Sequence, residues 1–520
     1  MNKSSFAARS PIAQLGILLS IAVNVLSAER TEHFDTDPGW DGHNNRASSP
    51  SPRTIRQDFG YSSSSHFGGP PGEMGGFITP AAEPAYYAKA IPNRTFNDPL
   101  SASGKIVCAG RKFHVLVGFF NAGTLNEWRT PNTIALRLQG RGDIFFAWVE
   151  YASSRWRAGA DNPGGFTKIR DPITGRSTLK GFPAGSTVHT WSIRYDPNAN
   201  GGTGSVTVTL DNETSICHVD PGHKADGATF NRFGLLNVMK QADDGGEVWL
   251  DDVTVNFGSR AVPGRSVNGE TEPAAHPEGF DRDPHWDEFQ NRRTYITHDV
   301  RPRFDFGYSS TRFAGGKGRG EIGGLVFRGD GRYTNMMAFY GDRLEELTLN
   351  RPLKASGKIA LHRGVSDSDV LFGFFHSEHS LNSGGSDRIS TPPDFLGVAI
   401  GAPSREGFYF APAYRVHGTE KKNAERGPHI LPNGAPHDWS LEYQPGDADI
   451  RNAGRAIPGT SGTITVTLDN ERATLAIPGN HQAVGAHFNR FGIITTQTDG
   501  NGQHIYFDDL TYTWSQAANQ

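Results

Sequence analysis

Two glutamates stand between glycines at matching places in the chain, Glu73 in GEMGG and Glu321 in GEIGG. Glycine on both sides of a strand residue removes bulk, so that a ligand or another backbone can approach closely. A carboxylate in that setting could accept sugar hydroxyls, or act as acid or base in glycoside cleavage. The alternative is a structural role, in which each glutamate pairs with a repeated arginine, such as Arg46 or Arg292, and holds a bulge.

Repeated histidines and tyrosines are the groups that could work with these glutamates. His189 and His437 each stand two residues before a tryptophan, and Tyr61 matches Tyr308. Imidazole and phenol groups can exchange protons with a substrate, so all four residues are candidate catalytic partners. The alternative is that each histidine begins a strand and satisfies backbone groups, while the tyrosine rings belong to the core.

Aromatic and basic side chains gather in the stretch where the two halves of the chain differ most. The first half reads IFFAWVEYASSRWRAG and the second reads GFYFAPAYRVHGTEKKN. Sugar rings present flat C–H faces that stack on aromatic side chains, and arginine can bind hydroxyl, carboxylate or sulfate groups. An alternating strand that buries half of its aromatic side chains is the alternative. The candidate ligand-binding residues are Trp148, Tyr151, Arg155, Trp156, Tyr409, Tyr414 and Arg415, with the repeated Arg46 and Arg292.

Aspartates recur at both ends of each half. Asp35 and Asp281 lie in the matching motifs FDTDPGW and FDRDPHW, and Asp252 and Asp509 close the matching motifs WLDD and YFDD. A first strand often lies beside the last strand of a sandwich, which would bring Asp35 to Asp252 and Asp281 to Asp509. Such clustered oxygen ligands would suit a structural Ca²⁺ ion. Carboxylates held in turns or salt bridges are the alternative.

All of these pairs belong to one long internal duplication. DFGYSS begins at residues 58 and 305, ASGKI at 102 and 355, and TVTLDNE at 207 and 465. The offset drifts because small insertions are tolerated in loops between strands. A period this long corresponds to a whole domain. We therefore expect a first domain at 32–257, a Gly- and Pro-rich linker at 258–279, and a second domain at 280–515.

The apolar pattern within each half alternates with a period of two residues. SVTVTLD, KFHVLVGFF, TIALRL and EVWLDDVTV follow it, and turn signals such as DPNANGGTG separate them. This pattern is typical of β-strands with one face in a core. RLEELTL is the one helix-like segment. The sequence therefore predicts an all-β protein with two tandem antiparallel β-sandwich domains.

The two cysteines change together between the halves. Cys108 corresponds to Leu361, and Cys217 corresponds to Leu475. Positions that switch together are expected to be neighbours, so the sequence predicts a Cys108–Cys217 disulfide in an exported protein. Two buried free thiols are the alternative.

The N-terminus and the overall charge bound where the protein acts and what it binds. Lys3 and Arg9 precede the short apolar run LGILLSIAVNVL, and Ser27 and Ala28 follow it, which is typical of a secretion signal over residues 1–28. We expect a periplasmic or extracellular protein with no membrane span after cleavage. The balance of 51 basic and 55 acidic residues gives a net charge of −4, which argues against nucleic acid as the partner.

Two blocks in each half carry a family resemblance. WSIRYDPNANGGTGSVTVTLDNE and FNRFGLLN…EVWLDDVTV, with their second-half counterparts, resemble the later strands of the concanavalin A-like lectin/glucanase superfamily, which includes LamG-like modules. The resemblance implies a jelly-roll sandwich whose concave sheet often holds a glycan. The Glu-x-Asp-x-x-Glu run of the superfamily's β-glucanases is not found; Glu247 comes nearest, and His504 replaces it in the second half.

These observations favour an exported protein that binds a polysaccharide or other glycan through tandem lectin-like domains. Two linked weak sites would gain avidity without any new contact. One alternative is a glycoside hydrolase or polysaccharide lyase that uses the repeated glutamates with histidine or tyrosine. The other is a structural or adhesive surface protein.

Overall fold

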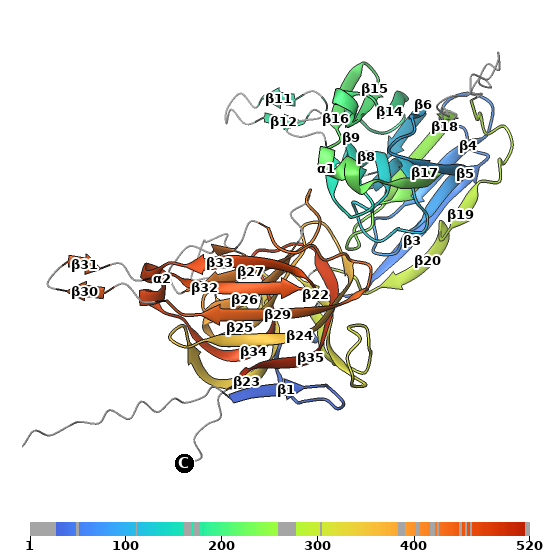
Figure 1. Ribbon diagram of the computed structural model, residues 1–520. Coiled ribbons are helices and arrows are strands. Elements are labelled where there is room, and N and C mark those ends of the chain that lie inside the picture. Colours follow the sequence, from blue (N-terminus) through green and yellow to red (C-terminus); the bar gives the residue numbers. More distant parts are fainter. Residues whose placement is uncertain are drawn as a thin grey trace, which may run out of the picture.

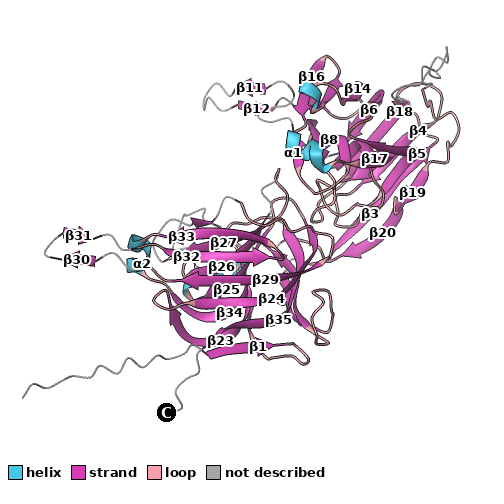
Figure 2. Ribbon diagram, viewed as in Figure 1, coloured by secondary structure: helices cyan, strands magenta, loops and turns pink. Residues whose placement is uncertain are grey.

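The protein is described by a computed structural model. The structure describes residues 28–47, 51–110, 112–160, 166, 168–170, 177–179, 181–257, 277–301, 304–382, 390–401, 405–416, 422–423, 426–446, 450–452, 455–457 and 460–514. The predicted secretion signal and most of the predicted linker lie outside these residues. Figures 1 and 2 show two lobes built almost wholly of strands.

The first lobe is a sandwich of two antiparallel sheets. One sheet has the order β16-β15-β14-β6-β18-β4-β3-β20. Its strands are β16 (Glu213–His218), β15 (Ser205–Leu210), β14 (His189–Asp196), β6 (Leu100–Ala109), β18 (Gly246–Asn256), β4 (Glu73–Ile78), β3 (Arg53–Ser62) and β20 (Arg292–Thr297). The other has the order β10-β9-β8-β7-β17-β5-β19, with β13 (Phe182–Pro183) also paired to β9. Its strands are β10 (Ala158–Ala160), β9 (Ile144–Ala152), β8 (Thr133–Arg141), β7 (His114–Phe120), β17 (Thr229–Asn237), β5 (Tyr86–Thr95) and β19 (Asp287–Phe289).

The second lobe repeats this plan. One sheet has the order β21-β22-β35-β24-β29-β32-β33, with β1 (Ala28–Glu32) also paired to β35. Its strands are β21 (Phe304–Ser309), β22 (Glu321–Phe327), β35 (Gly502–Trp514), β24 (Leu353–Gly364), β29 (Pro436–Gln444), β32 (Gly462–Leu468) and β33 (Glu471–Ile477). The other has the order β2-β23-β34-β25-β26-β27-β28. Its strands are β2 (Asp41–His43), β23 (Phe339–Thr348), β34 (His487–Thr495), β25 (Asp369–Phe375), β26 (Phe395–Gly401), β27 (Tyr409–Arg415) and β28 (Lys422–Asn423).

Short elements complete the description. Two hairpins stand apart from the sheets, β11 (Lys168–Arg170) with β12 (Ser177–Leu179) and β30 (Ile450–Asn452) with β31 (Arg455–Ile457). The helices are α1 (Pro221–Asp226), α2 (Gly479–Val484) and the 3₁₀ turns η1 (Asn200–Gly202), η2 (Thr334–Met336) and η3 (His379–Leu381).

Aromatic contacts between the sheets form the two cores. In the first sandwich Trp191 of β14 stacks on Phe233 of β17, with ring centroids 6.3 Å apart. In the second, Phe372 of β25 stacks on Phe507 of β35 at 3.9 Å. All four rings come from the apolar positions of alternating strands and are buried. The predicted all-β fold with two antiparallel β-sandwich domains is therefore confirmed.

One predicted local structure is wrong. RLEELTL, which resembles a helix in sequence, forms most of β23. The register of β23 against β34 shifts between Arg343 and Leu347, so the extra residues are taken up by a bulge. The paired strand on either side decides the conformation, because local helix propensity is a weak preference that tertiary pairing overrides.

The leading segments of the two halves are exchanged. β1 pairs with β35 and β2 pairs with β23, so the N-terminal segment belongs to the second sandwich. Reciprocally, β19 pairs with β5 and β20 pairs with β3 of the first sandwich. Figure 1 shows the blue β1 beside the dark red β35, and the yellow-green β19 and β20 beside the blue strands. The strand pairing thus differs from the expected domain bounds. The described strands of the first sandwich lie between Arg53 and Thr297, and the second sandwich uses β1 and β2 as well as the strands from Phe304 to Trp514.

The cores confirm that each exchanged segment is an integral part of the sandwich on which it lies. Phe34 and Trp40 are buried in the core of the second sandwich. Phe280 and Trp286 are buried in the core of the first. The motif FD-x-D-P-x-W therefore supplies two core aromatic residues to the opposite half of the repeat.

The paired glycines beside each repeated glutamate have a backbone reason. Gly75 and Gly76 in β4 have φ of +152° and +137°, and a Cβ on either would meet a backbone carbonyl of the neighbouring strand, at Val248 or Asp58. Left-handed φ and close backbone approach both favour glycine. The GEMGG motif is thus fixed by strand packing in the middle of a sheet.

Candidate functional site

The repeated glutamates each hold a loop. Glu73 has no exposed surface; the backbone N–H of His66 donates to its Oε2 at 3.0 Å, and His66 Nδ1 lies 2.5 Å from its Oε1. Glu321 is equally buried and accepts from the Thr311 hydroxyl at 2.5 Å and from two backbone N–H groups at 2.7 and 2.8 Å. The two glutamates therefore bind these loop groups and not Arg46 or Arg292.

The candidate catalytic partners lie apart from the glutamates. His189 is in register with Met74, the residue that follows Glu73. The strands that carry His189 and Met74 are three strand spacings apart in the sheet, which is about 14 Å. His189 Nδ1 lies 2.7 Å from Asp211, and its Nε2 lies 2.9 Å from the Pro183 carbonyl. His437 repeats the first contact with Asp469 at 2.7 Å. These histidines hold a hairpin to the strand beside it, and the structure does not bring them together with Glu73 or Glu321.

Tyr61, Tyr308 and the repeated arginines meet at the exchanged segments. Arg292 donates to Asp58 at 3.0 Å and to the backbone carbonyl of Tyr61 at 2.6 Å. Arg46 makes the same two contacts in the other sandwich, with Asp305 at 2.9 Å and the Tyr308 carbonyl at 2.6 Å. The two arginines therefore fasten each leading segment to the sandwich it joins, and both tyrosine rings pack half-buried against a core.

The predicted pairing of aspartates is wrong because the leading segments are exchanged. Asp35 follows β1, which pairs with the strand that carries Asp509, and His33 Nδ1 contacts Asp509 at 2.6 Å. Asp252 forms an ion pair with Lys105 at 2.7 Å. In the first sandwich Asp281 lies against Gly72. Within the residues that the structure describes, no group of three or more His, Cys, Asp or Glu side chains could hold a metal ion.

The predicted disulfide is also wrong. Cys108 and Cys217 are buried, and no disulfide joins them. They lie in the same sheet on β6 and β16, three strand spacings or about 14 Å apart across the sheet. Cys217 is level with Leu100, eight residues along β6 from Cys108, which adds about 26 Å. Because bonded cysteines need Cα atoms within about 7 Å, these two thiols cannot pair; burial raises the pKa of the Cys108 thiol.

The aromatic-basic stretch divides between three environments. Tyr151 and Tyr414 are core residues whose hydroxyls contact His223 and His481 at 3.0 and 2.9 Å. Trp156 packs against the core of the second sandwich, whereas Arg155 is exposed. Tyr409 and Arg415 are buried: the first donates to Glu406 at 3.2 Å and the second to the Thr391 carbonyl at 3.2 Å. Trp148 alone of these residues lies on the outer face of β9.

A buried polar cluster surrounds Trp148. Arg137 of β8 donates from Nε to Glu150 of β9 at 2.7 Å. The Arg137 guanidinium lies between two indole rings, 3.9 Å from the centroid of Trp148 and 4.8 Å from that of Trp128. Arg137 and Glu150 are 5% and 4% exposed. Alternation places these side chains on the face of the sheet opposite the core, under the segment 121–132 that follows β7.

His114, the first residue of β7, extends this cluster with a buried hydrogen-bond donor. Arg137 Nη1 lies 3.1 Å from His114 Nε2, and arginine can only donate, so Nε2 accepts and the neutral ring carries its proton on Nδ1. Burial and the nearby cation Arg137 hold the pKa of His114 well below its usual value, so the ring is neutral. Nδ1 is buried and has no hydrogen-bond partner among the described residues. A buried donor left unsatisfied is costly unless a ligand or water fills it.

A cavity of about 490 Å³ opens beside His114. Its lining residues are Lys112, His114, Gln139, Gly140, Arg141, Gly142, Phe146, Lys240 and Asp243. Three cationic side chains line the cavity with one carboxylate, and Lys112 is paired with Asp244 at 3.0 Å and lies 3.8 Å from Asp243. Lys240 is 9% exposed, and its pKa is lowered by burial although Asp243 lies 3.8 Å away. The cavity offers donors from several directions and an aromatic wall at Phe146.

The second sandwich lacks this arrangement. The corresponding sheets of the two sandwiches can be compared residue by residue. Gly118 of β7 and Gly373 of β25 occupy the same position, because each pairs with both neighbouring strands in the same register. The counterparts are Asp369 for His114, Ala399 for Arg137, Ala411 for Trp148, Ala413 for Glu150 and Thr498 for Lys240. Apolar side chains, including Phe339 and Phe375, pack around Ala399 and Ala413. The polar cluster is therefore a property of the first sandwich.

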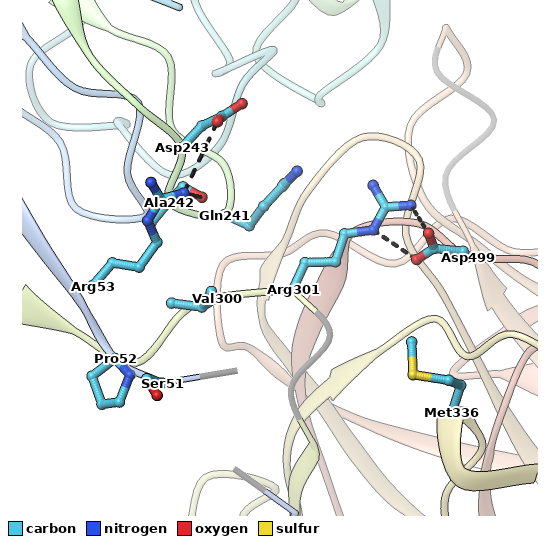
Figure 3. Close-up of a pocket in the computed structure, with 10 residues that line it drawn as sticks. All are labelled: Ser51, Pro52, Arg53, Gln241, Ala242, Asp243, Val300, Arg301, Met336 and Asp499. Atoms are coloured by element: carbon cyan, nitrogen blue, oxygen red, sulfur yellow. Dashed lines mark hydrogen bonds and ion pairs between the residues drawn. The ribbon is translucent and has the colours of Figure 1, made fainter. Parts of the chain in front are cut away.

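A second cavity, of about 730 Å³, lies where the sandwiches meet (Figure 3). Its lining residues are Ser51, Pro52, Arg53, Gln241, Ala242, Asp243, Val300, Arg301, Met336 and Asp499. Arg301 is paired with Asp499 at 2.6 Å, and Arg53 is paired with Asp244 and lies 4.0 Å from Asp243. Aspartates thus neutralise both arginines of this cavity, whereas the cavity beside His114 is lined by Arg141 and by a histidine whose buried Nδ1 has no hydrogen-bond partner among the described residues.

Sequence reasoning named Trp148 but missed His114, Arg137, Glu150 and Lys240. The available signal was a comparison of the halves position by position. A charged side chain stands in an alternating strand where the other half has alanine, as at Arg137 and Glu150. That comparison needs the strand registers, because the two halves differ in length between the fixed blocks.

Comparison with known proteins adds little to this description. No family model and no curated protein matches the chain. Among solved structures it is similar to domains LG4-5 of the mouse laminin alpha1 chain, with 11% identity, a TM-score of 0.21, and coverage of 90% of this chain and 92% of that one. It is also similar to the carbohydrate recognition domain of Emp47p, with 10% identity, a TM-score of 0.21, and coverage of 43% and 90%. No helix of the described residues is long and apolar enough to cross a membrane.

Proposed function

We propose that the protein binds an acidic polysaccharide in the cavity beside His114 of the first sandwich. The observation that carries the proposal is a cavity lined by His114, whose buried Nδ1 donor is unsatisfied among the described residues, and by three cationic side chains, of which Lys112 and Lys240 are paired with Asp244 and Asp243. A ligand with anionic oxygens would satisfy that donor and the cations together. Charge-assisted hydrogen bonds of this kind are about twice as strong as neutral ones.

A sugar polymer fits the cavity better than a small inorganic anion would. The cavity has the size of typical small-ligand sites. Phe146 supplies an aromatic wall on which the C–H face of a sugar ring can pack, and Gln139 offers an amide to a hydroxyl. Carboxylate or sulfate groups on successive sugars would meet the exposed Lys112 and Arg141 and the buried Lys240, all of which line the cavity.

Binding is proposed rather than cleavage because the repeated carboxylates face inward. Glu73 and Glu321 have no exposed surface and are occupied by loop groups. Glu150 is 4% exposed and accepts a hydrogen bond from Arg137 Nε at 2.7 Å. A general acid or base must reach the scissile bond of the bound sugar.

Replacing Lys240 with glutamine tests the proposal. We expect affinity for polygalacturonate to fall about ten- to a hundredfold, since one hydrogen bond to a charged group is worth about 1.5–3 kcal/mol. Affinity electrophoresis of the full chain in gels with polygalacturonate, dextran sulfate or neutral dextran measures it. Lys354→Gln is the matched control, because that lysine is 55% exposed on β24 of the second sandwich.

Three results would contradict the proposal. Equal retardation by neutral dextran would show that charge is not recognised. Equal loss of binding in Lys240→Gln and Lys354→Gln would show that the ligand is not bound specifically in the cavity beside His114. Release of reducing ends or of unsaturated products absorbing in the ultraviolet would replace binding by cleavage.

A further inference from the structure

We infer that the second sandwich supports the binding site of the first by holding segment 126–129 against the polar cluster that includes His114, a lining residue of the cavity. The inference rests on the proposed function and adds its regulation: ligand affinity at the first sandwich depends on contact between the two sandwiches. Consecutive residues of this one segment contact the second sandwich and the polar cluster.

Residues 126 and 127 face the second sandwich. Asn126 donates from Nδ2 to the Pro432 carbonyl, and its own carbonyl accepts from Arg363 Nε at 3.1 Å. Glu127 is 2% exposed and accepts from the Ser366 N–H at 2.9 Å and from the Ser366 hydroxyl at 3.2 Å. Burial raises the pKa of Glu127. A carboxylate this deeply enclosed depends on its partners in the second sandwich.

Residues 128 and 129 face the polar cluster. The Trp128 ring lies 5.3 Å from the ring of His114 and 4.8 Å from the Arg137 guanidinium. Arg129 lies 3.7 Å from Glu150. These two side chains therefore cover one side of the cluster and fix the Arg137 group that sets the tautomer of His114.

Contact with the second sandwich reduces the freedom of this cover before any ligand arrives. The segment contains no strand or helix. Without that contact, the ligand would have to order the segment on binding, and the lost conformational entropy would weaken the affinity. By linkage, a ligand that favours the covered state also favours docking of the sandwiches. Asn126, Glu127 and Arg363 act as positioning residues in this scheme.

The test removes contacts on the far side of the segment. Arg363→Ala deletes the hydrogen bond to the Asn126 carbonyl and also an ion pair with Asp299 at 2.9 Å, whereas Asn126→Ala leaves that ion pair in place. In full-length Arg363→Ala we expect faster amide hydrogen exchange at residues 126–129 and about tenfold weaker binding of polygalacturonate, with the unfolding temperature of the first sandwich unchanged. Asn126→Ala is the second variant and is expected to act in the same direction. Arg351→Ala is the matched control, because this exposed arginine lies beyond the opposite end of β24 from Arg363.

The outcomes separate this inference from the proposed function. Unchanged exchange at 126–129 in both variants overturns the inference, as does faster exchange with unchanged affinity. If the unaltered protein binds neither polygalacturonate nor dextran sulfate, the proposed function fails. Exchange alone then decides whether the second sandwich holds the segment, and faster exchange in the two variants but not in Arg351→Ala supports that it does.

Discussion

Replacing Trp40 with alanine is expected to destabilise the second sandwich and leave the first almost unchanged. Trp40 lies in the first half of the sequence repeat, yet its ring packs on Phe34, Tyr340 and Tyr512 with centroid distances of 5.4, 5.8 and 6.1 Å. It is 7% exposed within the core of the second sandwich. Truncating a buried tryptophan typically costs about 3–5 kcal/mol.

The measurement is amide hydrogen exchange in increasing urea, which follows the two sandwiches separately. Trp286→Ala is the matched variant, because Trp286 packs on Tyr87 and Phe280 of the first core at 5.8 and 5.3 Å. The two variants should show opposite patterns. In Trp40→Ala, β24 and β34 of the second sandwich lose protection, and in Trp286→Ala, β6 and β17 of the first sandwich lose it. Loss of protection in the first sandwich of Trp40→Ala would contradict the exchange of leading segments.

Replacing Arg137 with alanine is expected to destabilise the first sandwich by about 3–5 kcal/mol, because it leaves the buried Glu150 carboxylate without its nearest cation. The loss also opens the space between Trp128 and Trp148. Removing both charges should be milder than removing one. The second sandwich supports this expectation, since it has alanine at both corresponding positions, Ala399 and Ala413.

A double-mutant cycle in urea unfolding measures this coupling. Arg137→Ala/Glu150→Ala should recover part of the stability lost in Arg137→Ala, while the affinity for polygalacturonate stays lost. Additive effects of the two substitutions would mean that the ion pair contributes nothing as a pair. Full stability in the single variant would show that Arg129, 3.7 Å from Glu150, is a sufficient partner.

Much of the fold could be predicted from the sequence because its signals are local. Alternation in SVTVTLD and its counterpart marks β15 and β32, and the repeat gives two sandwiches. The partner of each leading segment could not be predicted. FDTDPGW and FDRDPHW supply the same phenylalanine and tryptophan, so either segment satisfies either core, and only three-dimensional pairing separates the two arrangements.

The site was harder to predict because its residues carry no repeated motif. Conspicuous repeated groups such as Glu73 and His189 hold loops and hairpins in both halves. The cluster residues occur once, and their common face depends on the registers of β7, β8 and β9. Cys108 and Cys217 switch with their counterparts although they lie far apart, because each is an independent apolar position in one core.

The most direct test of a single acidic-glycan site in the first sandwich is amide hydrogen exchange of the full chain with and without an oligogalacturonate. We expect slowed exchange around the cavity at residues 112–116, 139–146 and 238–243. The stretches of the second sandwich that correspond to the first two, 367–371 and 401–409, should be unaffected wherever the structure describes them. Equal slowing in both sandwiches, or slowing in the second sandwich only, would contradict it.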